Sequence, residues 1–557
     1  MKKQNLILKG MFALLFFFSV LPFEIIAQVD PIAEGKKNFD SRNYKVALRY
    51  YLDAYKANQN DLDINSKIAQ CYLNSNIDKS KALPYIEFVT KQAKFEPENL
   101  FFLGKAYHHS LKFDEAIAAY QRYIAAMEKK EKEIKAAQRE IEICNNAKSI
   151  VKNPLNVSFE NAGRKVNSEF ADYYPFTPGN GSLIVFTTRR KGNTGGVIDM
   201  DGYYTSEIYI SEFKNASWSK SKNIGVKLNT DYDEEAVGLS NDGKNLIVYI
   251  DHEDTYGDLY LSKWEKSGYQ LAVDVGPTVN TNKLETAGFT NSDNSILLFS
   301  TFKSGGNGGS DIWMAKKLPN GEWGIAENLG TEINTPYDED FPIISDDGKT
   351  LHFASNGHNT MGGFDVFTST WDETSGKWST PKNLGYPIND TYDNMVVSFL
   401  DNGREAYLST FRNDSYGDLD IYMVTFNNVE PKQSVLQVKA FSGDTSKVNP
   451  GVKLTVNALP GNSNYGSYKT KKNGTAAVVL DAGKYSITAE ANGFKTVTKE
   501  IAVDNKRVFT EKIPFQIIME GTATAEPKKD SKTKTGDKKK EATPEDKSKT
   551  KTKPKKG

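Results

Sequence analysis

The sequence predicts a multidomain protein: an all-α solenoid, then a β-propeller with five blades or alternatively six, then a small β-sandwich and a disordered tail. Three observations predict this order. Helical periodicity with small and aromatic residues at fixed offsets covers the N-terminal part of the chain. A longer unit recurs five times in the middle, and Lys, Thr and Pro dominate the last residues.

Composition and charge exclude several classes of protein. Hydrophobic residues make up 38% and charged residues 25% of the 557 residues, which is typical of a globular protein and not of a fibrous one. The net charge is zero but unevenly spread, with +2 over residues 1–28, +6 over residues 520–557 and −8 between them. A strongly basic nucleic-acid binder is therefore excluded for the chain as a whole, and two cysteines cannot build a disulfide framework.

The N-terminus has the pattern of an export signal. A basic start is followed by Met11–Phe23, an apolar run of 13 residues. This run is shorter than the roughly 20 residues that a membrane span needs. We therefore expect a signal peptide over residues 1–28, with an uncleaved anchor as the alternative. The mature protein is expected to have no transmembrane span and to lie in the periplasm or at the periplasmic face of the outer membrane.

Residues 29–152 carry small and aromatic residues at spacings typical of paired helices. In a helix–turn–helix repeat of about 34 residues, small residues lie where the helices touch and aromatic rings fill the gaps. Two copies share offsets of 9, 3 and 4 residues, with Gly35, Tyr44, Ala47, Tyr51 and Ala54 in the first and Gly104, Phe113, Ala116 and Tyr120 in the second. The pattern resembles the tetratricopeptide repeat, and a charged helix at Glu128–Val151 is expected to cap it.

A tetratricopeptide stack offers a concave groove, so the resemblance implies binding of a protein segment; a purely structural spacer is the alternative. Cys71 and Cys144 both fall in helical patterns, where buried free thiols are expected and a bridge between them stays open. The adjacent His108 and His109 would face different directions on a helix, so they do not predict a metal site.

A second type of repeat begins after Pro154. The segment Gly225–Asn229 recurs at Gly276–Asn280, Gly330–Asn334 and Gly385–Asn389, with a diverged first copy at Gly163–Asn167. The last four copies are 51, 54 and 55 residues apart. Within a unit, an acidic loop and a strand precede an Asp-Gly or Asn-Gly turn of the kind that closes hairpins, and a second strand follows.

Each unit ends with an acid, a branched apolar residue and an aromatic residue. These triplets begin at Glu207, Asp258, Asp311, Asp365 and Asp420. Four short strands in roughly 50 residues match the size of a propeller blade. The pattern resembles the TolB-type β-propeller, which we expect over residues 155–430. The repeated aspartates are expected to be structural, as acceptors of backbone N–H groups, with a ligand role as the less favoured alternative.

The acidic loops of three units are the predicted partner-binding face. They place a tyrosine beside carboxylates, at Tyr232, Asp233, Glu234, Tyr337, Asp338, Glu339, Tyr392 and Asp393. Exposed aromatic residues beside acids suit a polar protein interface; the alternative is that the tyrosines pack between blades. The spacing of the acids does not match a calcium loop, so we expect no metal and no cofactor.

Motifs of propeller enzymes and other common catalytic motifs are missing from the sequence. It contains no G-x-S-x-G, no H-E-x-x-H, no phosphate loop and no C-x-x-C, and it has only five histidines. We therefore expect no catalytic residues and no enzyme, although carboxylates are plentiful.

The C-terminal part combines a β domain with a polar tail. Residues 434–518 alternate apolar and polar residues in short runs, and Asp481–Ala489 followed by Gly493 and Phe494 resembles the carboxypeptidase regulatory-like β-sandwich, which is not catalytic. Residues 519–557 lack the apolar residues that offset ordering entropy, so a disordered Lys-rich tail is expected. The tail could contact an anionic surface; a merely solvated tail is the favoured alternative.

The order of these parts resembles that of envelope proteins of the type IX secretion and gliding machinery, the PorE-like group. Those proteins usually end in an OmpA-like domain that binds peptidoglycan. This sequence has the Lys-rich tail in that place, so the resemblance does not imply peptidoglycan binding. The predicted function is a non-enzymatic periplasmic or outer-membrane-associated adaptor. It would bind envelope proteins through the helical groove and the propeller face. A propeller that binds glycans or peptidoglycan fragments is the first alternative, and a propeller hydrolase is the second.

Overall fold

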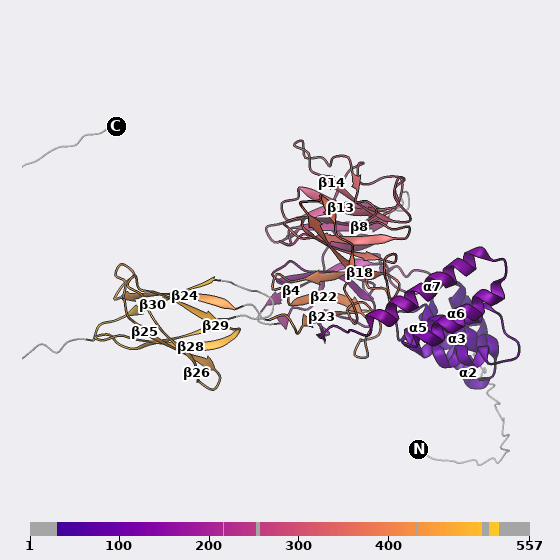
Figure 1. Cartoon of the computed structure of the whole chain (residues 1–557), viewed down its shortest axis with the longest axis horizontal. Coiled ribbons are helices and arrows are strands. Elements are labelled where there is room, and N and C mark those ends of the chain that lie inside the picture. Colours follow the sequence, from indigo (N-terminus) through magenta and orange to yellow (C-terminus); the bar gives the residue numbers. More distant parts are fainter. Residues whose placement is uncertain (1–29, 215–216, 252–256, 431–432, 504–511, 523–557) are drawn as a thin grey trace, which may run out of the picture. The chain divides into compact units, whose positions relative to one another are not determined.

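The structure of the protein is a computed structural model that describes residues 30–214, 217–251, 257–430, 433–503 and 512–522 (Figure 1). The predicted signal peptide and almost all of the predicted tail lie outside the described residues. The chain divides into two compact units: the first contains the described residues up to Ser434, and the second contains most of residues 435–522.

The helical region, residues 31–150, begins the first unit. Its α-helices are α1 (Pro31–Asp40), α2 (Tyr44–Ala57), α3 (Leu62–Leu73), α4 (Leu83–Thr90), α5 (Glu98–His109), α6 (Phe113–Met127) and α7 (Glu131–Ile150), with the short 3-10 helix η1 (Lys79–Ala82) before α4. Asp30, Asn43 and Asp61 cap α1, α2 and α3 by accepting backbone N–H bonds. None of the helices in the described ranges is long and apolar enough to cross a membrane.

The small residues of the helical repeat lie where neighbouring helices touch. A Cβ atom on Gly35 would lie 3.1 Å from the Tyr51 ring, and one on Gly104 would lie 2.5 Å from the Tyr120 ring. Ala47 and Ala116 are fully buried and Ala54 is nearly so. The shared offsets therefore reflect direct helix contacts, and Cys71 and Cys144 are both buried free thiols, as expected.

The propeller-like region, residues 157–426, follows. In its described part the strands form five antiparallel sheets. The first sheet contains β2 (Asp172–Phe176), β3 (Leu183–Thr188), β4 (Glu207–Lys214), β5 (Ser217–Trp218) and β6 (Lys222–Asn223). The second contains β7 (Asp233–Leu239), β8 (Asn245–Asp251), β9 (Asp258–Glu265), β10 (Gly268–Tyr269) and β11 (Val273–Asp274).

The other three sheets have the same plan. The third contains β12 (Glu285–Thr290), β13 (Ile296–Thr301), β14 (Asp311–Lys316) and β15 (Glu327–Asn328). The fourth contains β16 (Glu339–Ile344), β17 (Thr350–Ser355), β18 (Asp365–Asp372), β19 (Lys377–Trp378) and β20 (Lys382–Asn383). The fifth contains β21 (Val397–Phe399), β22 (Glu405–Thr410), β23 (Asp420–Phe426) and, from the other end of the region, β1 (Val157–Asn161).

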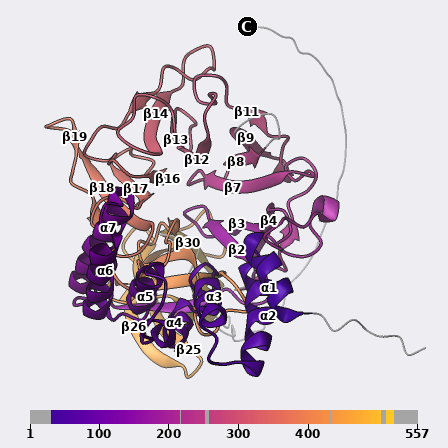
Figure 2. The same ribbon diagram turned by 90° about the vertical axis from the view of Figure 1, so that its right-hand side faces the viewer.

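The first strands of the sheets meet at a common centre. β7 contacts β2 and β12, β12 contacts β16, and β2 contacts β21 and β22. Figure 2 shows β2, β7, β12 and β16 arranged around this centre. β1 pairs with β23, with Val157 opposite Phe426, so the first strand of the region completes its last sheet.

The recurring Gly-to-Asn segment is held to a strand by a pair of hydrogen bonds. In each copy, the terminal asparagine donates its amide to a strand carbonyl and accepts the N–H of the same residue, at 2.8–3.0 Å. The pairs are Asn167–Ile421, Asn229–Ile208, Asn280–Leu259, Asn334–Ile312 and Asn389–Val366. In each of the last four pairs, the asparagine binds a strand residue that lies shortly before it in the sequence. Asn167 instead connects the start of the region to β23.

The repeated acid immediately precedes the residue that the asparagine binds. It is also the first residue of that strand. Asp365 accepts the N–H of Met361 and the amide of Asn383, and Asp311 accepts the corresponding groups of Asn307 and Asn328. Glu207 and Asp420 accept bonds of the same kind, from Asn223 and Asn161 respectively. Asp258 begins β9 and is buried.

The second unit consists of two sheets. One contains β24 (Ser434–Ser442), β27 (Thr475–Leu480) and β30 (Lys512–Met519), with β24 and β30 parallel. The other contains β25 (Lys453–Leu459), β26 (Ser463–Lys469), β28 (Gly483–Glu490) and β29 (Val497–Val503). Alternate residues of β24 and β25 are buried, including Leu436, Val438, Leu454 and Val456.

We predict that Asn167→Ala and Asn334→Ala both destabilise the propeller-like region, because each leaves a buried backbone N–H, that of Ile421 or Ile312, without its acceptor. The expected loss in the free energy of unfolding is about 1 to 3 kcal/mol for each variant. Only Asn167→Ala should also speed hydrogen exchange in β1, which Asn167 helps to hold on β23. Equal exchange of β1 in the two variants would contradict the assigned role of Asn167 in joining the two ends of the region.

Candidate functional site

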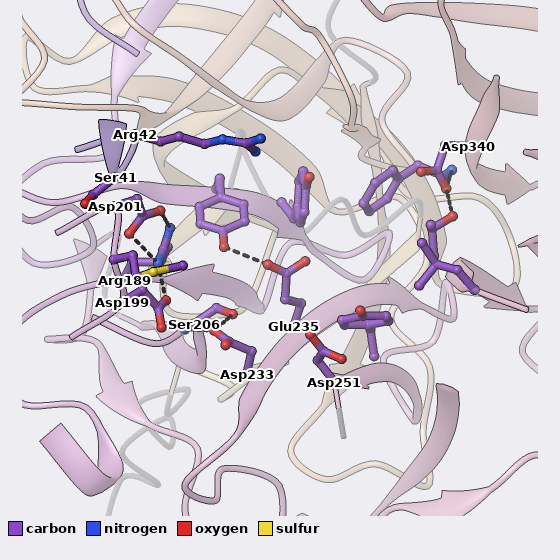
Figure 3. Close-up of a pocket in the computed structure, with 17 residues that line it drawn as sticks. Ser41, Arg42, Arg189, Asp199, Asp201, Ser206, Asp233, Glu235, Asp251 and Asp340 are labelled. Atoms are coloured by element: carbon purple, nitrogen blue, oxygen red, sulfur yellow. Dashed lines mark hydrogen bonds and ion pairs between the residues drawn. The ribbon is translucent and has the colours of Figure 1, made fainter. Parts of the chain in front are cut away.

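The candidate site is a cavity of about 680 Å³ at the centre where the first strands meet (Figure 3). We call it the central cavity. Its walls come from β2, β7, β8, β16, the 199–201 loop and the turn between α1 and α2. Figure 3 shows Arg42 of that turn lying along one edge of the cavity. The helical and propeller-like regions therefore build this site together.

At or near the start of each sheet's first strand, a structural residue is followed by one that lines a cavity. The structural acids accept the N–H and hydroxyl of a Ser or Thr four residues earlier, as in Thr230–Glu234 and Thr335–Glu339. The residue that follows differs from sheet to sheet: it is Tyr173, Glu235, Thr286, Asp340 or Met395. The repeat thus holds the strand ends in place and leaves one variable position per sheet at a cavity.

The two variable carboxylates are held by neutral donors. The Tyr173 hydroxyl donates to Glu235 at 2.7 Å, and the Thr286 hydroxyl donates to Asp340 at 2.8 Å. Burial raises the pKa of Glu235 to about 7 and that of Asp340 to about 6. Neither forms an ion pair with any residue that the structure describes.

Two aromatic rings meet across the cavity. Tyr174 follows Tyr173 in β2 and Phe341 follows Asp340 in β16, and their ring centroids are 4.4 Å apart. Both residues have left-handed backbone angles, with φ of 50° for Tyr174 and 48° for Phe341. Such angles cost about 1 to 3 kcal/mol each for a residue with a side chain. Each residue lies at a bulge in its strand, and the left-handed backbone there turns its ring toward the centre.

The cavity wall also holds a guanidinium. Arg189 lies between Asp199 and Asp201 and bonds to both, at 2.5 and 2.6 Å, and its guanidinium lies 5.0 Å from the Tyr203 ring centroid. Asp233 accepts the N–H and hydroxyl of Ser206. Over the described ranges, no three His, Cys, Asp or Glu side chains are grouped so that they could hold a metal ion.

Two further cavities continue from the central cavity along the helical region. One of about 570 Å³ shares Arg42, Tyr173, Tyr174, Arg189 and Asp201 with it and is also lined by Asn76. The next, of about 280 Å³, shares Lys79, Tyr392 and Asp393 with the second cavity. We call this series of three adjoining cavities, each of which shares lining residues with the next, the seam. It runs between the helical region and the propeller-like region.

Basic side chains of the helical region hold it on the propeller-like region. Lys45 contacts the buried Asp418 at 3.1 Å and lies over the Tyr203 ring. Arg139 lies 4.5 Å from the Tyr337 ring centroid and donates to the Asn356 carbonyl. Lys79 lies over the Tyr392 ring, whose hydroxyl accepts the Lys79 N–H.

Histidines add two direct bonds to this contact. His108 Nε2 donates to the Met361 carbonyl at 2.9 Å, and His109 Nδ1 lies 3.1 Å from the Thr391 hydroxyl. Burial lowers the pKa of both imidazoles. Met361 itself is fully buried in the hydrophobic cluster of the helical region. The adjacent histidines thus contact different segments, and neither belongs to a metal cluster among the described residues.

The predicted partner-binding residues fall into three groups. Glu234 and Glu339 are fully buried in the structural bonds described above. Tyr337, Tyr392 and Asp393 lie at the contact with the helical region, where Asp393 also accepts the Phe364 N–H. Asp338 accepts the Ser310 N–H, Asp233 lines the central cavity, and Tyr232 is 41% exposed.

The individually predicted residues include Glu234 and Glu339 but not Glu235 and Asp340, although both end the acidic loops, at 232–235 and 337–340, that are predicted to contact a partner. Glu235 and Asp340 lie one position beyond Glu234 and Glu339, within the same acidic loops. The available signal was that a buried strand repeats its first acid while the next position changes between copies. A change of that kind in an otherwise regular repeat marks a position that packing does not determine.

Comparisons with known proteins identify no family. No family model matches the chain, and no curated protein matches it. Similar solved structures include TolB from Acinetobacter baumannii, with 13% identity, a TM-score of 0.29 and coverage of 47% of this chain and 56% of that one. They also include an α-L-arabinofuranosidase from Lactobacillus brevis, with 12% identity, a TM-score of 0.28 and coverage of 49% and 93%.

The tricorn protease is a further similar structure, with 14% identity, a TM-score of 0.28 and coverage of 61% of this chain and 33% of that one. The chain thus spans little more than half of the TolB structure and a third of the protease. At these TM-scores the similarities carry no argument about function. The propeller-like description rests on the sheets and their pairing.

We predict that Lys45→Met weakens the docking of α1 and α2, because it leaves the Asp418 carboxylate buried without its cation. The expected loss is about 1 to 3 kcal/mol, measured as faster hydrogen exchange in α1 and α2. Lys56→Met, which removes an exposed pair with Asp53 on the same helix, is the matched control and should change stability by less than about 1 kcal/mol. Equal effects of the two variants would show that the Lys45 contact does not hold the helices in place.

We also predict a pH dependence of stability from Glu339. Burial raises its pKa to about 7, so the folded state takes up a proton that the unfolded state releases above its ordinary pKa. This contribution to stability is complete below the ordinary pKa and is lost as the pH rises through about 7.

Chemical denaturation at pH 5 and pH 8 tests this dependence. The free energy of unfolding should fall between these values by about 1 to 3 kcal/mol less in Glu339→Gln than in the unchanged protein. The glutamine keeps an acceptor for Thr335 and can donate to Ser355, so the fold should be retained. Parallel pH profiles for the two proteins would mean that Glu339 does not titrate in this range.

Proposed function

We propose that the protein is a non-enzymatic adaptor of the bacterial envelope that binds an extended segment of a partner protein along the seam. The observation that carries this proposal is that three adjoining cavities share lining residues along the contact between the helical and propeller-like regions. A row of adjoining cavities with mixed polar and aromatic walls suits a stretch of polypeptide better than a small molecule.

The chemistry of the walls supports binding without catalysis. The structural acids of the repeat are occupied by hydrogen bonds, and the cations at the contact between the regions are paired with carbonyls, carboxylates or tyrosine rings. The residues that remain for recognition are the variable positions at the strand starts. In this proposal the propeller-like region is a closed five-bladed ring with one blade per sheet, and tetratricopeptide-type helices form the other wall.

Location and assembly are part of the same proposal. The predicted signal peptide supports an exported protein, and the resemblance in domain order supports a link to type IX secretion or gliding machinery. The second unit would then act as a further attachment module. Linked modules raise each other's effective concentration at a shared assembly, which is how an adaptor strengthens weak contacts.

We expect the tagged full-length protein to retain defined proteins from envelope extracts of its source, and we expect Asn76→Trp to reduce this retention. Asn76 is an exposed residue that lines the middle cavity, so an indole there would fill the seam. Asn60→Trp, on an exposed loop that lines none of the three cavities, is the matched control. Quantitative mass spectrometry of the retained proteins gives the readout.

Three results would count against the adaptor. Retention that is equal in Asn76→Trp and Asn60→Trp would place binding away from the seam. Retention of the protein on insoluble sacculi without protein partners would favour the glycan-binding alternative. A hydrolytic activity that disappears in Glu235→Gln or Asp340→Asn would favour an enzyme.

A further inference from the structure

Basic side chains are the groups that this face of the propeller-like region already binds. Lys45, Lys79 and Arg139 each lie over a tyrosine ring, those of Tyr203, Tyr392 and Tyr337 respectively. The three tyrosines come from loops of different sheets. An ammonium or guanidinium on an aromatic face, with oxygen acceptors beside it, is thus a repeated solution at this surface.

The central cavity also combines carboxylates with aromatic rings, and its carboxylates outnumber its two basic lining residues, Arg42 and Arg189. Glu235 and Asp340 face it, Asp340 is only 8% exposed, and neither has a counter-ion in the described part of the chain. Their hydrogen-bond donors are the neutral hydroxyls of Tyr173 and Thr286. The rings of Tyr174 and Phe341 supply the aromatic surface.

Arg189 shows that this wall accepts a guanidinium. Its partners Asp199 and Asp201 line the same cavity, and the Tyr203 ring lies beside it. Glu235 and Asp340 line the same cavity as this group. Arg189 is ion-paired with Asp199 and Asp201, whereas neither Glu235 nor Asp340 forms an ion pair with a residue that the structure describes.

We propose that the central cavity receives a basic side chain, Arg or Lys, of the extended partner segment in the seam, held between Glu235 and Asp340 and against the rings of Tyr174 and Phe341. This inference rests on the proposed function and specifies the chemistry of the partner. An incoming cation stabilises the charged form of these two carboxylates, which burial otherwise disfavours. The seam would position the backbone of the segment, and the central cavity would select the basic residue.

Short fluorescent peptides test the charge requirement with the full-length protein. Four peptides differ only in the central residue, which is Arg, Lys, citrulline or norleucine, in a Gly-Ser background. Fluorescence anisotropy should show binding of the Arg and Lys peptides, weakened by added salt, and binding about tenfold or more weaker for citrulline and norleucine. Citrulline matches arginine in shape without its charge, so equal binding of the Arg and citrulline peptides would overturn the proposal.

Charge-neutralising variants test the assigned residues. Glu235→Gln and Asp340→Asn keep acceptors for Tyr173 and Thr286, so unchanged melting temperatures are expected. Each should weaken the Arg peptide by about tenfold or more, whereas Glu332→Gln, an exposed acid outside the three cavities, should change it by less than about twofold. Unaltered binding in both site variants, or no binding of any peptide, would overturn the proposal.

The outcomes separate this inference from the adaptor itself. Envelope partners that are retained by the unchanged protein, by Glu235→Gln and by Asp340→Asn, but not by Asn76→Trp, would support the adaptor. The same result would contradict the basic-residue site. If no partner is retained and no peptide binds, both fall. If soluble peptidoglycan fragments bind and the two site variants abolish that binding, the central cavity is a glycan site and the proposal is overturned.

Discussion

The propeller-like region depends on a single type of contact, the paired hydrogen bonds between an asparagine amide and one backbone residue. The amide has a donor and an acceptor side by side, so it satisfies the N–H and C=O of the residue after each strand's first acid. Without the asparagine the buried N–H would lose its acceptor, whereas the carbonyl also accepts a backbone N–H, as Ile312 does from Leu329. Five copies make the contact. In the first copy, Asn167 and its partner Ile421 are 254 residues apart in the sequence, so the same contact also joins the two ends of the region.

Much of the fold could be predicted from the sequence because its signals repeat. The repeated acids begin strands β4, β9, β14, β18 and β23, and the Asp-Gly and Asn-Gly turns have glycines with positive φ at 243, 348 and 403. The positions that line the central cavity and those that contact the helical region could not be predicted in the same way. Glu235 and Asp340 vary between copies, and the contacts of Tyr337 and Tyr392 with the helical region depend on how distant segments pack, which no local pattern encodes.

The contact between the two regions gives the predicted partner-binding tyrosines a role within the chain. Tyr337 and Tyr392 bind Arg139 and Lys79, and Tyr203 binds Lys45 in the same manner. The surface of the propeller-like region therefore already binds basic side chains of its own chain. The helical region is thereby held where its turn at Arg42 borders the central cavity, so the cavity and its edge form one site.

The pairing of β1 with β23 has a mechanical consequence. Because the strands are antiparallel, the start of β1 and the end of β23 lie next to each other, where Asn427 donates its backbone N–H and its side-chain amide to Asn156. A force that pulls these neighbouring ends apart would separate the two strands one hydrogen bond at a time. It would act first on the bonds that Asn156 forms with Asn427 and Asn428, before it reached the paired residues of β1 and β23.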